Sequence, residues 1–268
     1  MSFSIAGKSA IVTGAANGVG LAIARRFVDE GANVMFADRD EARLEDELGA
    51  AAGEGAARMF PCDLRERLAQ ANLLSATIDA FDRVDILVNA SRQVVLSDPL
   101  DRADRSIDAM LEQNLLSAFR LSQLVAGRMI RQSEADGEEG APAGAIVNLS
   151  SIAAQRSRPD LLAYSVACAG IDQMTRSLAL ALAPHRIRVN AIAFGSVMSE
   201  SLKGILRDDP PLRDRITEAT PLGRIAAPGA VAEAAQFLAS DGASFVTGEV
   251  LRVDGGRSVL DASGTSAC

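Results

Sequence analysis

The segment from Lys8 to Asp38 constrains the fold of this chain more than any other stretch. It opens with the apolar run Ser9–Val12, which has the length of a fully buried parallel strand. A glycine-rich turn follows, then an apolar-periodic helix that ends near Glu30, and then a second apolar run at 33–37 that leads to Asp38. This order of strand, turn, helix and strand predicts a βαβ unit, the building block of a parallel α/β sheet.

The turn after the first strand reads Thr13-Gly14-Ala15-Ala16-Asn17-Gly18-Val19-Gly20. Gly14 allows a tight turn, Gly18 lets a ligand approach the backbone, and Gly20 allows close packing of helix and strand. Free N–H groups at the start of the helix, together with the helix dipole, form a site for a pyrophosphate. The candidate cofactor-binding residues of this turn are Gly14, Asn17, Gly18 and Val19. The alternative is a glycine-rich turn in an unrelated α/β protein.

Asp38 indicates which dinucleotide the turn would bind. It lies 24 residues after Gly14, at the tip of the second predicted strand. A carboxylate at that place accepts hydrogen bonds from the adenosine ribose. Because the same negative charge repels a 2′-phosphate, we expect NAD(H) rather than NADP(H) as the cofactor.

The spacing Gly14-x-x-x-Gly18-x-Gly20, preceded by Thr13, resembles the short-chain dehydrogenase/reductase family, and further matches recur along nearly the whole chain. Strands and helices alternate throughout, which predicts a single domain over residues 1–268. The fold class is α/β, a Rossmann-type doubly wound parallel sheet of about seven strands with helices on both faces. The resemblance also implies that Asp63 binds the adenine, with Leu64 beside it. The alternative for Asp63 is an N-cap of the next helix.

Composition excludes several other classes of function. Acidic residues outnumber basic ones by 35 to 27, a net charge of −8, which argues against a nucleic-acid groove or an anionic membrane surface. No signal pattern and no apolar run of about 18 residues is present, so we expect a cytoplasmic protein without a membrane segment. Three cysteines and one histidine make neither a disulfide framework nor a metal site.

Three residues carry the catalytic chemistry that the resemblance implies. Ser151 ends the fifth predicted strand, and Tyr164, the only tyrosine, follows 13 residues later at the start of a helix. The serine hydroxyl would bond the substrate oxygen while the phenol gives or takes a proton. Asn114, on a helix predicted over 103–132, would hold a water of a proton relay. The alternatives are a hydrogen-bonded core amide for Asn114 and an ordinary aromatic for Tyr164.

The family's lysine is missing from the position four residues after the tyrosine. Cys168 stands there and brings no positive charge, although a free phenol with a pKa of about 10 is a poor base at neutral pH. The chain holds only two lysines. Lys8 begins the first strand, away from the expected site, and Lys203 lies in a segment that would have to swing in. Cys168 has no base near it in sequence, which argues against a nucleophilic role.

Two further departures flank the expected nicotinamide position. Where the family shows Asn-Asn-Ala-Gly, this chain has Asn89-Ala90-Ser91-Arg92, so Asn89 remains a candidate cofactor residue. Arg92 would either clash with the nucleotide or swing out to touch phosphate or substrate. Phe194 replaces a proline. Beyond it, the resemblance implies that Val197 offers backbone groups to the nicotinamide amide and that Ser199 keeps the hydroxyl of a threonine.

Two segments are expected to lie outside the regular alternation. The acidic stretch 133–144 contains Gly and Pro and few apolar residues, which predicts a flexible surface loop. The stretch 199–228 is the expected substrate lid. The C-terminal part resembles the family's tetramer interface, so we expect a homo-oligomer, either a tetramer or a dimer.

Two functions follow from these residues. The first is an NAD-dependent oxidoreductase that interconverts a small-molecule secondary alcohol and a ketone. The second is a catalytically impaired protein of the same fold that binds a nucleotide or a protein partner. The second rests on Arg92, Cys168 and Phe194, taken as three independent departures.

Overall fold

The predicted Rossmann-type sheet is confirmed. A computed structural model describes residues 3–49, 55–137 and 140–261, and its seven strands pair in parallel in the order β3-β2-β1-β4-β5-β6-β7. The chain order reverses between β1 and β4, the switch point at which such sheets bind ligands. The strands are β1 Ser9–Thr13, β2 Asn33–Asp38, β3 Ala57–Pro61, β4 Ile86–Asn89, β5 Gly144–Ser151, β6 Ile187–Phe194 and β7 Val250–Val253.

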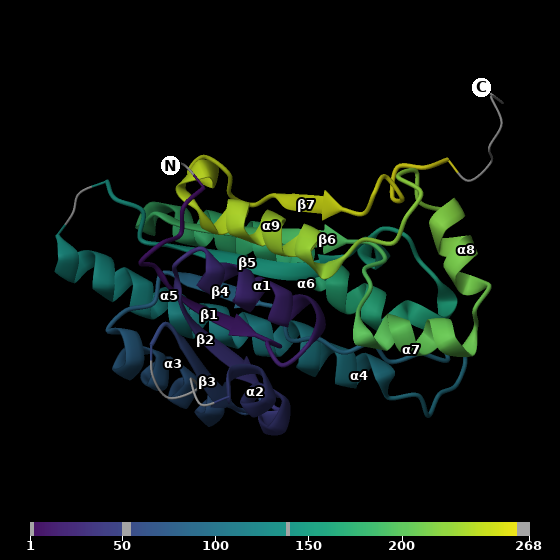
Figure 1. Cartoon of the computed structure of the whole chain (residues 1–268), viewed down its shortest axis with the longest axis horizontal. Coiled ribbons are helices and arrows are strands. Elements are labelled where there is room, and N and C mark those ends of the chain that lie inside the picture. Colours follow the sequence, from purple (N-terminus) through teal and green to yellow (C-terminus); the bar gives the residue numbers. More distant parts are fainter. Residues whose placement is uncertain (1–2, 50–54, 138–139, 262–268) are drawn as a thin grey trace.

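The central strands are apolar because helices cover both faces of the sheet. On one face α1 (Gly18–Asp29), α2 (Glu41–Leu48) and α9 (Pro228–Ala239) pack against alternate strand residues such as Val12. On the other face α3 (Arg67–Phe81), α5 (Ser117–Asp136) and α6 (Leu162–Leu182) pack against residues such as Ile11 (Figure 1). A strand with both faces buried reads as a continuous hydrophobic run, which is the pattern that made β1 recognisable.

The helix predicted over 103–132 is interrupted. The short helix α4 (Ser106–Met110) leads into a π-helical segment, Leu111–Leu116, before α5 begins. The predicted loop at 133–144 is too long, because α5 continues to Asp136, ends at a left-handed Gly137, and β5 starts at Gly144. Residues 138–139 of that prediction lie outside the described residues, as do residues 50–54, which follow α2 and its C-cap Gly49.

The carboxyl ends of the strands share one edge of the sheet, and the expected lid lies beyond it. Within 199–228 the chain forms α7 (Glu200–Asp208) and α8 (Leu212–Glu218), at the right-hand end of the molecule in Figure 1. None of the helices described is long and apolar enough to cross a membrane.

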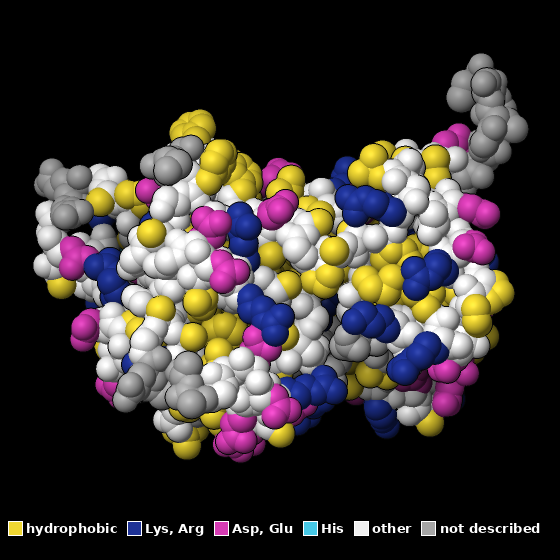
Figure 2. All heavy atoms as spheres, viewed as in Figure 1, with side chains coloured by type: hydrophobic (Ala, Val, Ile, Leu, Met, Phe, Trp, Pro, Cys, Tyr) yellow, Lys and Arg dark blue, Asp and Glu magenta, His cyan; other side chains and the backbone are white. Residues whose placement is uncertain are grey.

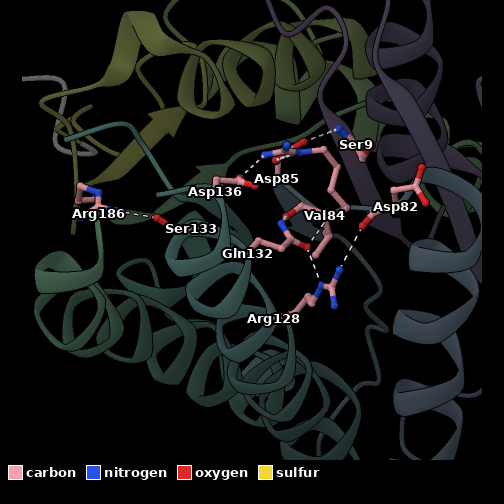
Figure 3. Close-up of polar contacts among 10 residues, drawn as sticks. Ser9, Asp82, Val84, Asp85, Arg128, Gln132, Ser133, Asp136 and Arg186 are labelled. Carbon is pink, nitrogen blue, oxygen red and sulfur yellow. Dashed lines mark hydrogen bonds and ion pairs between the residues drawn. The ribbon is translucent and has the colours of Figure 1, made fainter. Parts of the chain in front are cut away.

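The opposite edge of the sheet is closed by polar contacts (Figure 3). The Gln132 side chain accepts from the backbone N–H of Val84 (3.1 Å) and donates to the Val84 carbonyl (2.9 Å). Asp85 accepts from the N–H of Ser9 at 2.9 Å and pairs with Arg83 at 2.8 Å. These contacts fix the start of β4 and the start of β1.

Candidate active site

The glycine-rich turn has the geometry that its sequence predicts. Gly14 has a φ of +67°, and a Cβ there would lie 2.8 Å from the carbonyl oxygen of Ala90. A Cβ on Gly20 would lie 2.1 Å from the carbonyl oxygen of Gly14, so the helix meets the strand too closely for any side chain. The turn therefore brings the start of α1 against the ends of β1 and β4.

The start of α1 has the donors that a pyrophosphate needs. Gly18 has a φ of +58°, and the nearest atom to a Cβ built there is the Ser199 Cβ at 3.9 Å, which leaves the backbone accessible. Among the residues that the structure describes, the Asn17 side chain makes no capping hydrogen bond to α1. The first turn of α1 contains no acidic side chain. The Ser199 hydroxyl caps α7 by accepting from Leu202 N (3.2 Å), so a second helix begins beside the first. The N–H groups of the first turn and the absence of a Cβ at Gly18 fit an anionic diphosphate.

The acidic candidates lie at the ends of β2 and β3. Asp38 is half-buried and accepts from the N–H groups of Ala16 and Asp40, both at 3.1 Å, which holds its carboxylate at the edge of the turn. The guanidinium of Arg65 binds Asp63 and lowers the pKa of that carboxyl. The N-cap alternative for Asp63 is wrong, because the N-cap of α3 is Glu66.

Leu64 and Asn89 turn their side chains away from the expected nucleotide position. Leu64 is buried in the core between the sheet and α3. The Asn89 amide donates to the hydroxyl of Ser122 (2.9 Å) and to the side-chain oxygen of Asn148 (2.8 Å), all of them inside the protein. Both residues can therefore contact a cofactor only through backbone atoms.

Thr13 has a role that the sequence interpretation did not assign. Its hydroxyl accepts from the N–H groups of Ala90 (2.9 Å) and Ser91 (3.0 Å), and so ties the end of β1 to the loop after β4. The signal in the sequence was a hydroxyl side chain at the last position of a buried strand. The contact fixes the backbone immediately before Arg92.

Ser151 and Tyr164 come together as the catalytic interpretation requires. Ser151 is the last residue of β5 and Tyr164 lies in the first turn of α6, where only 4% of it is exposed. Burial raises the pKa of the Tyr164 phenol to about 12, against an opposing effect of Arg92 and of hydrogen bonding with Ser151. The phenol is therefore protonated at neutral pH.

Asn114 lies in the π-helical segment and holds the backbone after Arg92. Its side-chain oxygen accepts from Gln93 N and its amide donates to the Gln93 carbonyl, both at 2.9 Å. The amide is thus hydrogen-bonded, as the core-polar alternative expects. The proton-relay role of Asn114 remains a prediction.

Cys168 is a neutral, buried thiol one helical turn after Tyr164. Burial raises its pKa to about 11, while the charge of Arg92 acts in the opposite direction. Asp172, one turn further along α6, is also buried; its carboxyl pKa is raised by burial, and one oxygen has no hydrogen-bond partner among the described residues. Lys8 pairs with Asp241 at 2.8 Å at the opposite edge of the sheet, far from these groups.

The guanidinium of Arg92 packs against aromatic rings near the end of β5, while both expectations for it concern a bound nucleotide or substrate and remain predictions. Its guanidinium lies over the ring of Phe194, 3.9 Å from the centroid, and 5.7 Å from the centroid of the Tyr164 ring. Its Nη1 donates to the Ser150 carbonyl at 3.3 Å. Phe194 lies directly opposite Ser151 on neighbouring strands. Arg92, Phe194 and Cys168, the three positions that the resemblance marks as departures, therefore lie close together around Tyr164.

Known proteins match the chain over nearly its whole length. The family model described as "Enoyl-(Acyl carrier protein) reductase" matches residues 14–258. The chain belongs to the short-chain dehydrogenase/reductase family. Galactitol 2-dehydrogenase (L-tagatose-forming) from Cereibacter sphaeroides is 37% identical to this short-chain dehydrogenase/reductase, over 96% of this chain and 97% of the relative.

Two solved structures of the family show which cofactors it accommodates. A gluconate 5-dehydrogenase from Burkholderia cenocepacia, in complex with NADP and tartrate, is 29% identical with a TM-score of 0.85 and covers 97% of this chain and 98% of its own. A 7α-hydroxysteroid dehydrogenase in complex with NADH is 31% identical with a TM-score of 0.86 and covers 95% and 96%. These relatives are dehydrogenases of small-molecule alcohols and ketones, and they bind nicotinamide cofactors of both kinds.

Proposed function

We propose that this short-chain dehydrogenase/reductase is an NAD(H)-dependent oxidoreductase that interconverts a secondary alcohol and a ketone. The observation that carries the proposal is the meeting of Ser151 and Tyr164 at the carboxyl edge of the sheet, beside the uncapped start of α1. A proton donor and a hydroxyl that can bond the substrate oxygen thereby lie next to a site for a dinucleotide.

The residues toward the cofactor divide by the part that each would hold. The start of α1 would bind the pyrophosphate, Asp38 the adenosine ribose, and Asp63 the adenine. Backbone groups of Leu64, Asn89 and Val197 would complete the contacts, with Ser199 and Tyr164 toward the nicotinamide end. When bound, the nicotinamide supplies or accepts a hydride; the residues of the chain itself bind, orient and move the proton.

The proton chemistry depends on the Tyr164 phenol. A phenol whose pKa is about 12 is a proton donor at neutral pH, which suits reduction of a carbonyl. Oxidation of an alcohol needs the phenolate instead. The fraction of phenolate rises with pH up to the pKa, so oxidation should be favoured by alkaline conditions.

The substrate class is proposed from the relatives and the surface. Polyols, sugar acids and their ketones are the first compounds to screen, because the relatives above act on galactitol and gluconate. Figure 2 shows basic side chains around an apolar surface at the end of the molecule where α7 and α8 lie, and the segment 199–228 is proposed as the substrate lid. We further propose a cytoplasmic homo-oligomer.

Binding of NADH, compared with NADPH, tests the proposal first. The chain has no tryptophan, so the fluorescence of the reduced nicotinamide can be read without that background. We expect NADH to bind more tightly than NADPH, and Asp38→Ala to reduce that preference, because the carboxylate repels a 2′-phosphate. No binding of either cofactor would overturn the proposal.

A nucleotide-binding protein without turnover is the second candidate. The neutral Cys168 thiol favours it, because that position brings no charge to lower the pKa of the phenol. Binding of NADH without turnover of any polyol, sugar acid, steroid or corresponding ketone between pH 6 and 10 would favour this second candidate over the oxidoreductase.

A further inference from the structure

The loop after β4 holds Arg92 from both sides. Before it, the Thr13 hydroxyl accepts from the N–H groups of Ala90 and Ser91, and after it, the Asn114 side chain bonds both backbone groups of Gln93. The Cα of Arg92 is therefore fixed relative to β1 and to the π-helical segment. From this fixed position the side chain reaches the Ser150 carbonyl at the end of β5.

The guanidinium of Arg92 also has a defined seat. It stacks on Phe194 at 3.9 Å and donates to the Ser150 carbonyl at 3.3 Å. Stacking on an aromatic face and donating to a carbonyl are contacts that a planar guanidinium makes well. Phe194 is buried with 3% exposure, so the stack rests on the core of the sheet.

We propose that Arg92 is the positioning cation of Tyr164: seated on Phe194 and the Ser150 carbonyl, it stabilises the phenolate form of the tyrosine. This inference deepens the proposed function and rests on it for its catalytic meaning. A cation beside a phenol favours the charged phenolate over the neutral phenol. Arg92 thus does from a neighbouring strand loop what Cys168 cannot do from α6.

The other groups around Tyr164 leave Arg92 as the stabilising charge. Cys168 on α6 is a neutral thiol whose ionisation would oppose that of the phenol, and Ser151 on β5 is an uncharged hydroxyl. From α4, the apolar side chains of Met110 and Ile107 belong to or pack against the same buried cluster as Tyr164. Asp172 lies two turns along α6 from Tyr164 and acts on Cys168.

The proton step that Arg92 affects involves one bond broken and one bond formed. In oxidation, the substrate O–H bond breaks and its proton forms a bond with the phenolate oxygen; in reduction, the phenol O–H breaks and its proton passes to the substrate oxygen. Arg92 touches neither oxygen in this step. It changes how readily the phenol loses its proton.

The single tyrosine makes a direct test possible. With one tyrosine and no tryptophan, the absorbance change at 295 nm on raising the pH reports Tyr164 alone. A stopped-flow jump from pH 8 to pH 11.5 separates a fast phase, ionisation in the folded protein, from a slow phase that follows unfolding. With the pKa raised to about 12, we expect only part of the folded wild type to ionise in the fast phase.

The variants separate charge from structure. We expect Arg92→Met to reduce the fast amplitude at least fivefold, Arg92→Lys to retain most of it, and Arg25→Met to leave it unchanged. Arg25→Met is the matched control, because it removes the same positive charge from a different place. Arg25 lies on α1 in an ion pair with Glu47. If Arg92→Met does not fold, Arg92→Gln replaces it, since it keeps a donor for the Ser150 carbonyl.

The outcomes for Arg92 and for the proposed function are distinguishable. An Arg92→Met protein with the wild-type fast amplitude would overturn the role of Arg92, even if the enzyme is active. A lost amplitude with no turnover of any substrate by the wild type would leave Arg92 as the cation of Tyr164 while refuting the oxidoreductase. If the protein is an oxidoreductase and Arg92 acts on Tyr164, the pH profile of alcohol oxidation should shift to higher pH in Arg92→Met. In Arg92→Lys the profile should lie near that of the wild type.

Discussion

The chain segments before and after β4 are each held by the side-chain amide of one residue, and the two contacts serve different purposes. At its start, the Gln132 amide bonds the N–H and the carbonyl of Val84 (Figure 3); at its end, the Asn114 amide bonds the N–H and the carbonyl of Gln93. We call each of these a backbone clamp. Both clamping residues lie on the continuous run from the π-helical segment into α5.

The difference lies in what each clamp holds in place. The Val84 clamp sits among ion pairs and backbone contacts, with Arg128 donating to the Asp82 carbonyl at 3.1 Å and Asp85 bonded to Ser9. The Gln93 clamp sits next to Arg92, whose charge faces an aromatic ring and a phenol. An identical hydrogen-bond pattern therefore secures the fold at one edge of the sheet and aims a cation at the other.

The largest effect is expected from Tyr164→Phe, which removes the proposed proton donor and leaves both clamps intact. Loss of a general acid or base lowers turnover by about 10²–10⁴-fold. Initial rates of ketone reduction measure this, and unchanged NADH binding is the control for the nucleotide site. Residual activity above one tenth of the wild type would place the proton donor elsewhere.

The pH dependence comes next in size. With the Tyr164 pKa raised to about 12, alcohol oxidation should rise about tenfold per pH unit from neutral pH until the protein unfolds, because only the phenolate accepts a proton. Reduction should stay nearly flat over the same range, since the phenol is already protonated. A plateau of the oxidation rate below pH 9 would contradict the raised pKa of the buried phenol.

The clamps themselves can be compared by Gln132→Ala and Asn114→Ala. Each change strips two backbone groups of their partners, at a cost of about 1–3 kcal/mol for a buried group. Val84 is fully buried and Gln93 half-buried, so we expect Gln132→Ala to lower the free energy of unfolding more. We expect only Asn114→Ala to change turnover and the fast absorbance phase of Tyr164. Equal effects of both variants on turnover would remove the functional distinction between the two ends.

The smallest effect is expected from Cys168→Lys. A lysine there would add a second cation near Arg92 in a buried place, where like charges repel and desolvation is costly. We expect Cys168→Lys alone to change turnover near pH 7 by no more than about threefold. In an Arg92→Met background we expect the same substitution to raise turnover more. A large gain in turnover from Cys168→Lys alone would show that Arg92 does not act as the cation of the phenol.

Much of the site could be predicted from local sequence. Thr13-Gly14, Gly20 and Asp38 lie where spacing placed them, because glycine conformations and strand ends are set by a few neighbouring residues. The extent of α5 and the N-cap alternative for Asp63 were predicted wrongly. Helix ends depend on contacts from distant segments, and the N-cap of α3 lies three residues beyond Asp63 at Glu66.

The sequence by itself determined the parallel α/β sheet and the glycine-rich turn, because both follow from short-range periodicity and motif spacing. The pairing of Ser151 with Tyr164 was implied by the family resemblance. The resemblance also implied that Arg92, Cys168 and Phe194 depart from the family pattern. Only the tertiary structure decided that these three residues meet, since they come from the β4 loop, α6 and β6 and their contact depends on strand order and register. Spacing along a chain carries no information about such a contact, and it is there that a cation was found beside the phenol.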